Sequence, residues 1–391
     1  MFKIQTLNNI SDKGLILFEK DLYRISGEIA DPDAIIVRSQ KMHDMVLPPS
    51  VLGIARAGAG VNNIPVEKCT ERGIVVFNTP GANANSVKEL VLSALLISSR
   101  KIPEGIAWAK TLKDKGEEAS KIIEKEKSNF TGPEIAGKTL GVIGLGAIGV
   151  LVANAALYLG MNVLGYDPFL SIESAWGLSP SVQKAGSLDS LIAKSDYITL
   201  HIPQNDETKN LINRDKFALM KNGVRLLNFA RGGLVNTKDL LSAIEQGKIE
   251  RYVTDFPEAE MLTNDNIIPI PHLGASTPEA EENCAIMAVN QIREFLVNGN
   301  ILNSVNFPAC SAEPSAGARL LISNKNIPNM LSQILAALAE ENINVDDMLN
   351  KHRDSVAYNI IDVTQKKVSD AVMKKISGIE GIIRVRTLNR N

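Results

Sequence analysis

Features that mark metal centres, secretion and membrane spans are missing from this sequence of 391 residues. Its cysteines, Cys69, Cys284 and Cys310, form no Cys-x-x-Cys pair, and its histidines have no metal-ligand spacing. We therefore expect no metal site and a reducing, cytoplasmic environment. The longest largely apolar run, Leu90–Ile97, is too short to cross a bilayer, and the first residues lack the apolar core of a signal peptide.

The charge balance also excludes some partners. The net charge is −2, from 42 Lys and Arg against 44 Asp and Glu, so neither nucleic acid nor an anionic membrane is an expected partner. The content of 45% hydrophobic and 22% charged residues is ordinary for a globular protein with sizeable cores. The length suggests two or three domains.

A glycine-rich turn stands near the middle of the chain. Gly144, Gly146 and Gly149 follow an apolar run typical of a buried strand and precede Val150–Leu159, whose apolar residues have helical spacing. Glycines at these positions allow a tight turn, close approach of a pyrophosphate, and close packing of helix on strand. The phosphates would lie at a helix N-terminus, which favours anions. We therefore predict a dinucleotide site.

The acid that follows indicates which dinucleotide binds. Asp167 ends the next apolar run, Met161–Tyr166, where a carboxylate can accept both ribose hydroxyls of an adenosine. NADP sites usually need an arginine here, but Asp167 is followed by Pro168 and Phe169. We expect NAD.

Three polar residues follow apolar runs of this half of the chain: Arg231, Glu260 and His272. An arginine followed by two glycines suits bidentate binding of a substrate carboxylate. A histidine can take a proton from a hydroxyl whose carbon gives hydride to a nicotinamide, and a glutamate can orient the imidazole. Alone, His272 could be a turn residue, Arg231 a surface ion pair, and Glu260 a solvated loop acid. Together beside a nucleotide site, they favour catalysis.

Five motifs carry a resemblance to a known family. They are Arg56-Ala57-Gly58-Ala59-Gly60-Val61-x-Asn63, Asn78-Thr79-Pro80, Gly144–Gly149, Asn228-x-Ala230-Arg231-Gly232-Gly233 and Pro271-His272-Leu273-Gly274-Ala275-Ser276. On these motifs the chain resembles the D-isomer-specific 2-hydroxyacid dehydrogenases over nearly its whole length.

The resemblance implies Arg231 for the carboxylate and keto oxygen, His272 as acid/base, and a supporting Glu. In the family, this Glu lies five residues after an Asp that matches Asp255, which selects Glu260. This loop departs from the family's common Asp-Val-Phe pattern, so Glu258 remains an alternative. The implied substrate-binding residues are Arg38, Ser39, Arg56, Gly58 and Asn83, with Arg38 and Ser39 near a substrate phosphate. The implied cofactor-binding residues are Gly144, Gly146, Ala147, Ile148, Gly149, Asp167, Pro203, Ala230 and Asp255.

The expected fold class is α/β, with two doubly wound Rossmann-like domains and a C-terminal domain. We expect a discontinuous substrate-binding domain (1–97 and 280–308), an NAD-binding domain (98–279), a Pro/Ala/Ser linker (309–318) and a last domain (319–391). The last domain has the ferredoxin-like order βαββαβ and resembles the ACT regulatory domain. Its first loop departs at Asn324 and Asn329 from the serine-binding pattern His-x-Asn-x-Pro-Gly, so we expect weak or absent serine inhibition.

The implied reaction is the NAD-dependent oxidation of 3-phospho-D-glycerate to 3-phosphohydroxypyruvate, the first step of L-serine biosynthesis, by a homodimer or homotetramer. A phosphorylated 2-hydroxy acid is thus the expected partner. Two alternatives stay open. One is another D-2-hydroxyacid dehydrogenase, such as a glyoxylate/hydroxypyruvate or D-lactate reductase. The other is an NAD-sensing interaction protein, because some co-repressors share this fold.

Overall fold

The computed structural model describes residues 1–389, and the chain folds into two compact units. Unit 1 comprises Met1–Ala82 and the chain from Glu281 onward, and unit 2 comprises Asn83–Ala280. The three-domain division drawn from the sequence stays a prediction.

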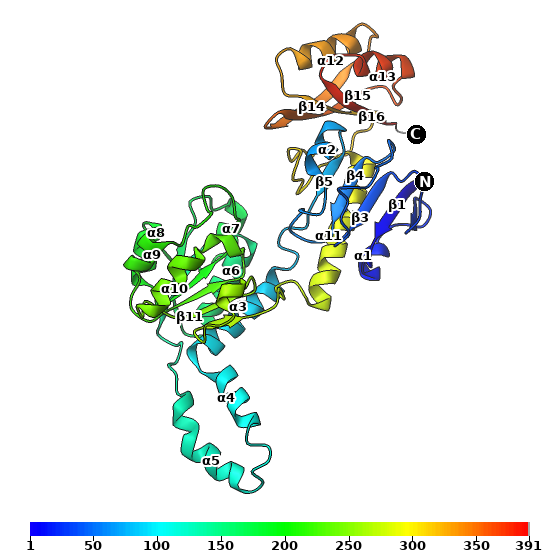
Figure 1. Ribbon diagram of the computed structural model, residues 1–391. Helices are drawn as coiled ribbons and strands as arrows, with labels where there is room; N and C mark the ends of the chain where they lie inside the picture. Colours follow the sequence, from blue (N-terminus) through cyan, green and yellow to red (C-terminus); the bar gives the residue numbers. More distant parts are fainter. Residues whose placement is uncertain (390–391) are drawn as a thin grey trace. The chain divides into compact units, whose positions relative to one another are not determined.

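The N-terminal part of unit 1 is a parallel sheet of order β2-β1-β3-β4-β5 (Figure 1). Its strands are β1 (Phe2–Leu7), β2 (Tyr23–Ser26), β3 (Ala34–Val37), β4 (Gly53–Arg56) and β5 (Val75–Phe77), with helices α1 (Asp12–Leu15), α2 (Val66–Glu71) and α11 (Pro278–Asn298). Strand β3 is buried on both faces, which explains its continuous apolar sequence. Ile36 packs in the core that contains α11, whereas Ile35 and Val37 pack in the core that contains α2.

Unit 2 is built on a seven-stranded sheet of order β12-β11-β10-β9-β6-β7-β8. The strands are β6 (Thr139–Ile143), β7 (Asn162–Tyr166), β8 (Gln183–Lys184), β9 (Tyr197–Leu200), β10 (Val224–Asn228), β11 (Ile249–Thr254) and β12 (Ile267–Pro269). The helices are α3 (Ala84–Ser99), α6 (Ala147–Tyr158), α7 (Ile172–Gly177), α8 (Leu188–Lys194), α9 (Arg214–Leu219) and α10 (Thr237–Glu245), and the 3₁₀ turns are η2 (Gly232–Leu234) and η3 (Ala259–Met261).

The helices of unit 2 cover both faces of its sheet. Residues of α3 and α6 share one core with the sheet, and residues of α8, α9 and α10 share the other. The strand order reverses between β6 and β9. Ligands of open α/β sheets bind beyond the carboxyl ends of the strands at such a switch point.

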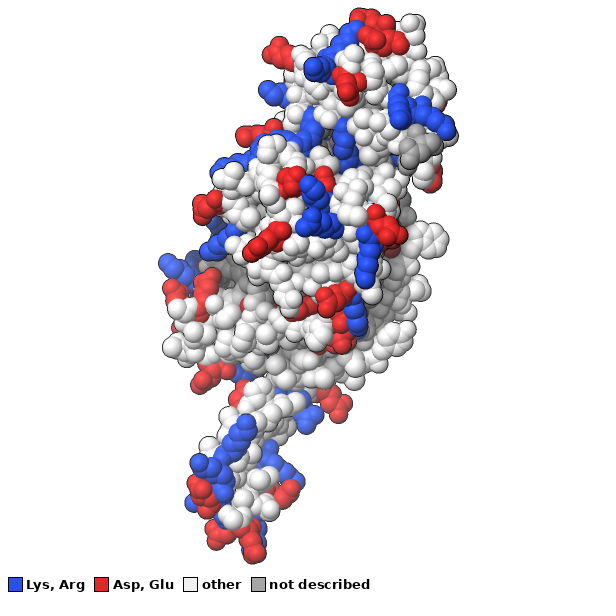
Figure 2. All heavy atoms as spheres, turned by 90° about the vertical axis from the view of Figure 1, so that its right-hand side faces the viewer, with Lys and Arg blue, Asp and Glu red and all other residues white. Residues whose placement is uncertain are grey.

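A helical arm extends from unit 2. It contains α4 (Ile102–Lys110), α5 (Glu118–Glu126) and η1 (Lys127–Phe130), and none of the described residues in these three elements is buried. The rings of Trp108 and Phe130 pack 5.1 Å apart. Figure 2 shows basic and acidic side chains interspersed on this arm, at the bottom of the view. The arm therefore lacks a core of its own.

The C-terminal part of unit 1 is an antiparallel sheet of order β14-β15-β13-β16. Its elements are β13 (Arg319–Lys325), α12 (Met330–Ala339), β14 (Val345–Arg353), β15 (Val356–Val363), α13 (Asp370–Ser377) and β16 (Ile382–Leu388). Leu320 and Ile322 pack with α12 and α13, while Leu321 and Tyr358 pack in the core that contains α11. The two sheets of unit 1 are therefore joined through α11, and the predicted fold class is confirmed.

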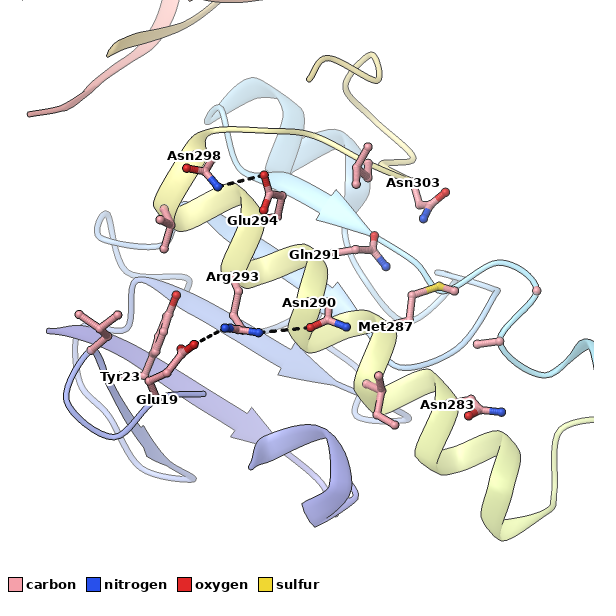
Figure 3. Close-up of a pocket in the computed structure, with 16 residues that line it drawn as sticks. Glu19, Tyr23, Asn283, Met287, Asn290, Gln291, Arg293, Glu294, Asn298 and Asn303 are labelled. Atoms are coloured by element: carbon pink, nitrogen blue, oxygen red, sulfur yellow. Dashed lines mark hydrogen bonds and ion pairs between the residues drawn. The ribbon is translucent and has the colours of Figure 1, made fainter. Parts of the chain in front are cut away.

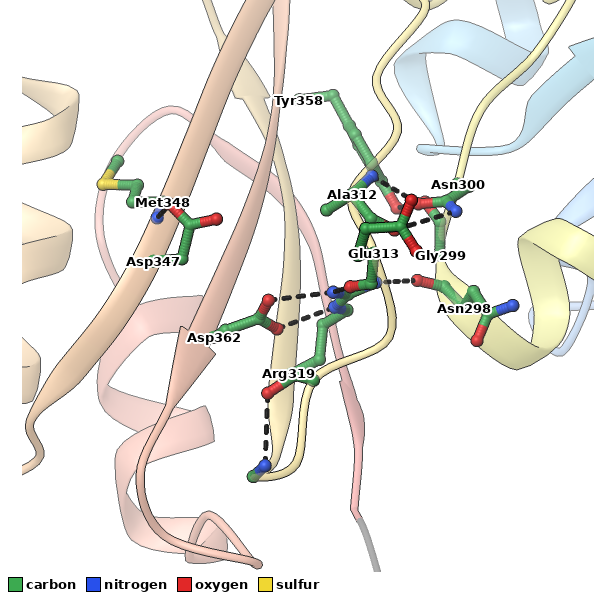
Figure 4. Close-up of polar contacts among 12 residues, drawn as sticks. Asn298, Gly299, Asn300, Ala312, Glu313, Arg319, Asp347, Met348, Tyr358 and Asp362 are labelled. Atoms are coloured by element: carbon green, nitrogen blue, oxygen red, sulfur yellow. Dashed lines mark hydrogen bonds and ion pairs between the residues drawn. The ribbon is translucent and has the colours of Figure 1, made fainter.

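An ion pair between Arg319 and the largely buried Asp362 lies at this join (Figure 4). Arg319 is 0% exposed and donates to both carboxylate oxygens of Asp362, at 2.7 and 2.8 Å, and to the carbonyl of Asn298 at 2.9 Å. Such a bidentate pair is geometrically specific, and losing one partner would leave a buried charge. Arg386 of β16 likewise donates to the carbonyl of Phe295, near the end of α11, at 2.6 Å.

Among residues 1–389, no helix combines the length and the apolarity that crossing a bilayer would require.

Candidate active site

The glycine turn joins β6 to α6 at the switch point. Gly144 has a φ of +90°, and a Cβ there would lie 2.6 Å from the carbonyl oxygen of His201. A Cβ on Gly149 would lie 1.9 Å from the carbonyl oxygen of Gly144, whereas a Cβ on Gly146 would meet no described atom within 4 Å. The first and third glycines are thus needed for the turn and its packing, and the second leaves space over the first turn of α6. Open backbone at a helix N-terminus fits a pyrophosphate.

Asp167 is held in place at the end of β7. Its Oδ2 accepts from the N–H of Leu145 at 2.8 Å, and its Oδ1 accepts from the N–H of Phe169 at 2.8 Å. A carboxylate has about four acceptor positions, so it can still accept two hydroxyls. Asp167 lines a cavity of about 460 Å³, together with Leu145, Pro168, Leu178, Val182 and Lys184 among others. These residues suit an adenosine.

Lys184 was not predicted as a site residue. Lys184 lies in β8, a strand of two residues that has no apolar run from which a strand could be predicted. The structure places this exposed lysine in the wall of the Asp167 cavity. The sequence has no arginine directly after Asp167, and the presence of Lys184 in this cavity could not be predicted from it.

The loop after β9 supports the other side of the turn. The Nε2 of His201 lies 3.0 Å from the hydroxyl of Thr199, and its backbone N–H donates to Ile143 at 2.8 Å. Burial lowers the pKa of His201 to about 3, so its ring is neutral near pH 7. The carbonyl of Pro203 accepts from the hydroxyl of Thr208 at 2.7 Å. These contacts fix the loop rather than supply an acid or base.

The three predicted catalytic residues follow three adjacent strands. Arg231 comes after β10, Glu260 after β11 and His272 after β12. The side chain of Arg231 is exposed, and its NH1 donates to the carbonyl of Ala230 at 2.6 Å. The buried Asn228 donates to the carbonyl of Arg231 at 2.9 Å and accepts from the N–H of Ala230 at 3.2 Å. The backbone of Arg231 is thereby fixed while its guanidinium faces solvent.

His272 and Asp255 belong to one polar group. Asp255 is 2% exposed, its Oδ2 accepts from the N–H of Gly274 at 3.3 Å, and its Oδ1 has no hydrogen-bond partner among residues 1–389. Burial raises the pKa of Asp255, and the charge of His272 opposes that rise. The exposed ring of His272 packs on Phe256, with centroids 4.6 Å apart. An unpartnered buried oxygen fits a residue that awaits a hydrogen-bond donor from a ligand.

The structure does not bring Glu260 to His272. Glu260 lies in the 3₁₀ turn η3, is exposed, and has no side-chain hydrogen bond or ion pair to any residue in 1–389. Glu258, the alternative, accepts a hydrogen bond from the hydroxyl of Thr237 at 2.9 Å. The supporting role of Glu260 stays a prediction, and the free side chain makes Glu260 the more available of the two.

The predicted substrate residues of unit 1 lie at the carboxyl edge of its first sheet. Arg38 and Ser39 follow β3, and Arg56 ends the adjacent strand β4. The Nε of Arg56 donates to the carbonyl of Arg38 at 3.0 Å, and a Cβ on Gly58 would lie 2.6 Å from the NH1 of Arg56. The guanidinium of Arg38 pairs with Glu281, with NH1 and Oε2 2.6 Å apart. This pair could not be predicted from the sequence, because its members are far apart along the chain.

Asn83, the remaining predicted substrate residue, belongs to unit 2. It is the N-cap of α3, and its carbonyl accepts from the hydroxyl of Ser86 at 3.0 Å. The same hydroxyl is 2.6 Å from the carbonyl of Gly274. Asn83 thus lies on the segment that Ser86 ties to the His272 loop.

A separate cavity of about 870 Å³ lies along α11 in unit 1 (Figure 3). Arg293 pairs with Glu19 there, and Glu294 accepts from Asn298 at 3.1 Å. Of the residues that line this cavity, none is a predicted site residue. Cavity volume alone therefore does not locate the predicted chemistry. Within residues 1–389 there is also no cluster of three His, Cys, Asp or Glu side chains suited to a metal ion.

Comparison with known proteins identifies the family. Residues 92–275 match the family described as D-isomer specific 2-hydroxyacid dehydrogenase, NAD binding domain. The D-3-phosphoglycerate dehydrogenase of Haemophilus influenzae is 33% identical over 87% of this chain and 82% of its own length. The chain belongs to the D-isomer specific 2-hydroxyacid dehydrogenase family. Its NAD-binding domain contains the glycine turn, Asp167, Arg231, Glu260 and His272.

Other members of this 2-hydroxyacid dehydrogenase family are longer. The D-3-phosphoglycerate dehydrogenase of Methanocaldococcus jannaschii is 37% identical over 79% of this chain, which spans 58% of that relative's length. For the relatives from Archaeoglobus fulgidus and Synechocystis, the chain spans 54% and 50% of their length.

Solved structures of dehydrogenases agree in fold with this chain. The NAD+-bound 3-phosphoglycerate dehydrogenase of Entamoeba histolytica is 26% identical, with a TM-score of 0.61 over 78% of this chain and 98% of its own. The apo D-mandelate dehydrogenase of Rhodotorula graminis is 22% identical, with a TM-score of 0.66 over 80% and 99%. At 22% identity, the likeness to the D-mandelate dehydrogenase shows a shared fold alone.

Proposed function

We propose that this chain oxidises 3-phospho-D-glycerate to 3-phosphohydroxypyruvate with NAD, the first step of L-serine biosynthesis. The observation that carries the proposal is the convergence of Arg231, Asp255 and His272 on neighbouring strand ends of the NAD-binding sheet. The names of the similar curated proteins support the substrate.

The residues that would hold NAD are those of the switch point. Ala147 and Ile148 present backbone N–H groups at the start of α6, and Asp167 accepts the ribose hydroxyls. Pro203, Ala230 and Asp255 are proposed to contact the rest of the cofactor, with the unpartnered Oδ1 of Asp255 as acceptor for an amide N–H. The nicotinamide, when bound, supplies the hydride acceptor.

The proposed roles of the catalytic residues follow from their chemistry. Arg231 binds the carboxylate and keto oxygen with two parallel hydrogen bonds. His272 takes the proton of the substrate hydroxyl at a ring nitrogen, and the buried carboxylate of Asp255 favours the positive charge that results. Glu260 is proposed to orient the imidazole, which requires its free side chain to move toward His272.

The phosphate is assigned to Arg38 and Ser39, with Arg56, Gly58 and Asn83 as further substrate contacts. A guanidinium binds phosphate and carboxylate in the same bidentate manner. The basic residues Arg38 and Arg56, at the carboxyl ends of adjacent strands, favour a phosphorylated substrate over glyoxylate, hydroxypyruvate or lactate.

The test is NADH formation from 3-phosphoglycerate, coupled to removal of the keto product. Turnover of this substrate well above that of D-lactate and D-glycerate is expected. Preference for a bare hydroxy acid would make the chain another dehydrogenase of the family. Absence of turnover with any of them, with NAD still bound, would favour an NAD-sensing interaction protein.

We further propose that the chain forms a homodimer or homotetramer, in the cytoplasm. The arm of α4 and α5 supports an assembly because it exposes Ile102, Ile106 and Ile123 at 42%, 52% and 38% without a core of its own. The three cysteines are buried and free, which fits a reducing compartment. Light scattering of the purified chain, alone and with Ile106→Asp, tests the assembly.

A further inference from the structure

Arg38, which is proposed to bind the substrate phosphate, is already paired with a carboxylate of the same chain. The NH1 of Arg38 lies 2.6 Å from the Oε2 of Glu281, in the N-terminal part of α11. The two side chains are 34% and 45% exposed, so solvent and ligands reach the pair. Mutual hydrogen bonding raises the pKa of Arg38 and lowers the pKa of Glu281.

The backbone beneath this pair is fixed. The carbonyl of Arg38 accepts from the Nε of Arg56 at 3.0 Å and from the amide of Asn63 at 3.3 Å. Burial raises the pKa of the Cys284 thiol, farther along α11, and the nearby charges of Arg38 and Arg56 oppose that rise. Two guanidiniums and one carboxylate therefore share a small region at the carboxyl ends of β3 and β4.

A carboxylate and a phosphate use a guanidinium in the same way. Each places its oxygens on the guanidinium N–H fork, and arginine stays charged at any working pH. A phosphate that binds Arg38 must therefore displace Glu281 or share the fork with it. Sharing would set two like charges side by side.

Resting on the proposed function, we propose that Glu281 is an internal competitor for the substrate phosphate on Arg38. It is a specificity-determining residue, since it weakens the binding of phosphorylated substrates and leaves bare 2-hydroxy acids almost unaffected. It also keeps Arg38 ordered and neutralised when no substrate is bound.

A simpler role for Glu281 is possible on general grounds, because acidic residues stabilise helix N-termini. Glu282, the next residue, separates the two roles. It lies on the same turn of α11 and pairs with Lys13 at 2.8 Å, away from Arg38. Glu281→Gln and Glu282→Gln remove the same charge from the same helix end, so only a competitor role makes them differ.

The experiment compares KM and kcat of both variants with 3-phosphoglycerate, with D-glycerate and with NAD. Glu281→Gln is expected to lower KM for 3-phosphoglycerate about two- to fivefold, the range set by a half-exposed ion pair. Its kcat and its KM for D-glycerate and NAD should stay within error. Glu282→Gln should match the wild type in all of these, and Arg38→Ala with Glu281→Gln should behave as Arg38→Ala alone.

Two results would overturn the proposal: an unchanged or higher KM for 3-phosphoglycerate in Glu281→Gln, or an equal shift for both variants. Titration calorimetry with inorganic phosphate gives a readout that does not depend on turnover. Glu281→Gln should bind phosphate about two- to fivefold more tightly than the wild type. If the wild type turns over no phosphoglycerate, the proposed function is wrong, while the phosphate titration still decides the role of Glu281.

Discussion

The backbone N–H of Gly274 donates a hydrogen bond across 3.3 Å to the buried carboxylate of Asp255. A Cβ on Gly274 would itself lie 3.3 Å from that carboxylate oxygen and 3.4 Å from Val87. The bond ties the His272 loop to the end of β11 and sets a buried negative charge beside the proposed acid/base. The carboxylate of Asp255 should therefore lower the free energy of unfolding while it supports catalysis.

The variant Asp255→Asn tests both effects. Burial raises the pKa of Asp255 above its ordinary value of 3.8, so the unfolded chain releases this proton first. The free energy of unfolding then falls as pH rises from 3.8 through the folded-state pKa, and it stays lowered above both. Asp255→Asn should raise the free energy of unfolding by about 1 kcal/mol at pH 7 and leave it unchanged well below pH 3.8, while lowering kcat. Urea unfolding against pH measures this, with the exposed Asp206→Asn as control.

His272→Ala should lower kcat by roughly 100- to 10,000-fold, the usual scale for losing general acid/base help. NAD affinity should change little, because His272 lies outside the glycine turn. Steady-state kinetics and a fluorescence titration of NADH separate the two effects. His352→Ala, which changes an exposed histidine of β14, is the matched control. A loss of NADH binding as large as the loss of kcat would contradict the acid/base role.

Glu260→Gln should move the pH–rate profile to lower pH, because a carboxylate that orients the imidazole also favours its protonated form. Glu258→Gln should leave the profile in place, since Glu258 is bonded to Thr237. The pH dependence of kcat/KM for both variants decides between the two acids. The reverse outcome would transfer the supporting role to Glu258.

Asp167→Ala should relax the preference for NAD over NADP. The carboxylate that repels a 2′-phosphate is lost, and Lys184 lines the same cavity. One charge-assisted contact is worth about 1.5–3 kcal/mol, so the NADP/NAD ratio of kcat/KM should rise tenfold or more. Adding Lys184→Ala should cancel most of that gain. A wild type that already uses both cofactors equally would rule out the role of Asp167.

The sequence predicted the elements whose signal is local. The order βαββαβ expected for residues 319–391 is observed as β13, α12, β14, β15, α13 and β16. Gly144–Gly149 was readable because the turn needs glycine for steric reasons. In each case neighbouring residues determine the structure.

Contacts between distant segments could not be predicted in this way. The Arg38–Glu281 pair and the Gly274–Asp255 bond arise only when strands and helices pack. Lys184 lies on a strand of two residues, below the length at which alternation can be seen. Asn329, which stands where the serine-binding pattern has Gly, has a φ of +70° at the start of α12, a conformation that asparagine adopts more readily than most residues.

The loop around Asn324 bears on regulation by serine. Asn324 is 2% exposed, its Oδ1 accepts from the amide of Asn359 at 2.7 Å, and its Nδ2 donates to the carbonyl of Lys325 at 2.7 Å. The polar groups of Asn324, which stands where the serine-binding pattern has His, are therefore already used within the fold.

Serine at micromolar concentration should consequently leave the activity unchanged. A ligand would have to break the bonds of Asn324 and pass the Asn329 side chain, at a cost of about 1 kcal/mol each, which together weaken affinity more than tenfold. An inhibition titration with L-serine, with D-serine as control, measures this. Half-inhibition in the micromolar range would show that Asn324 releases its partners for the ligand. Asn324→Ala would then have to abolish the inhibition.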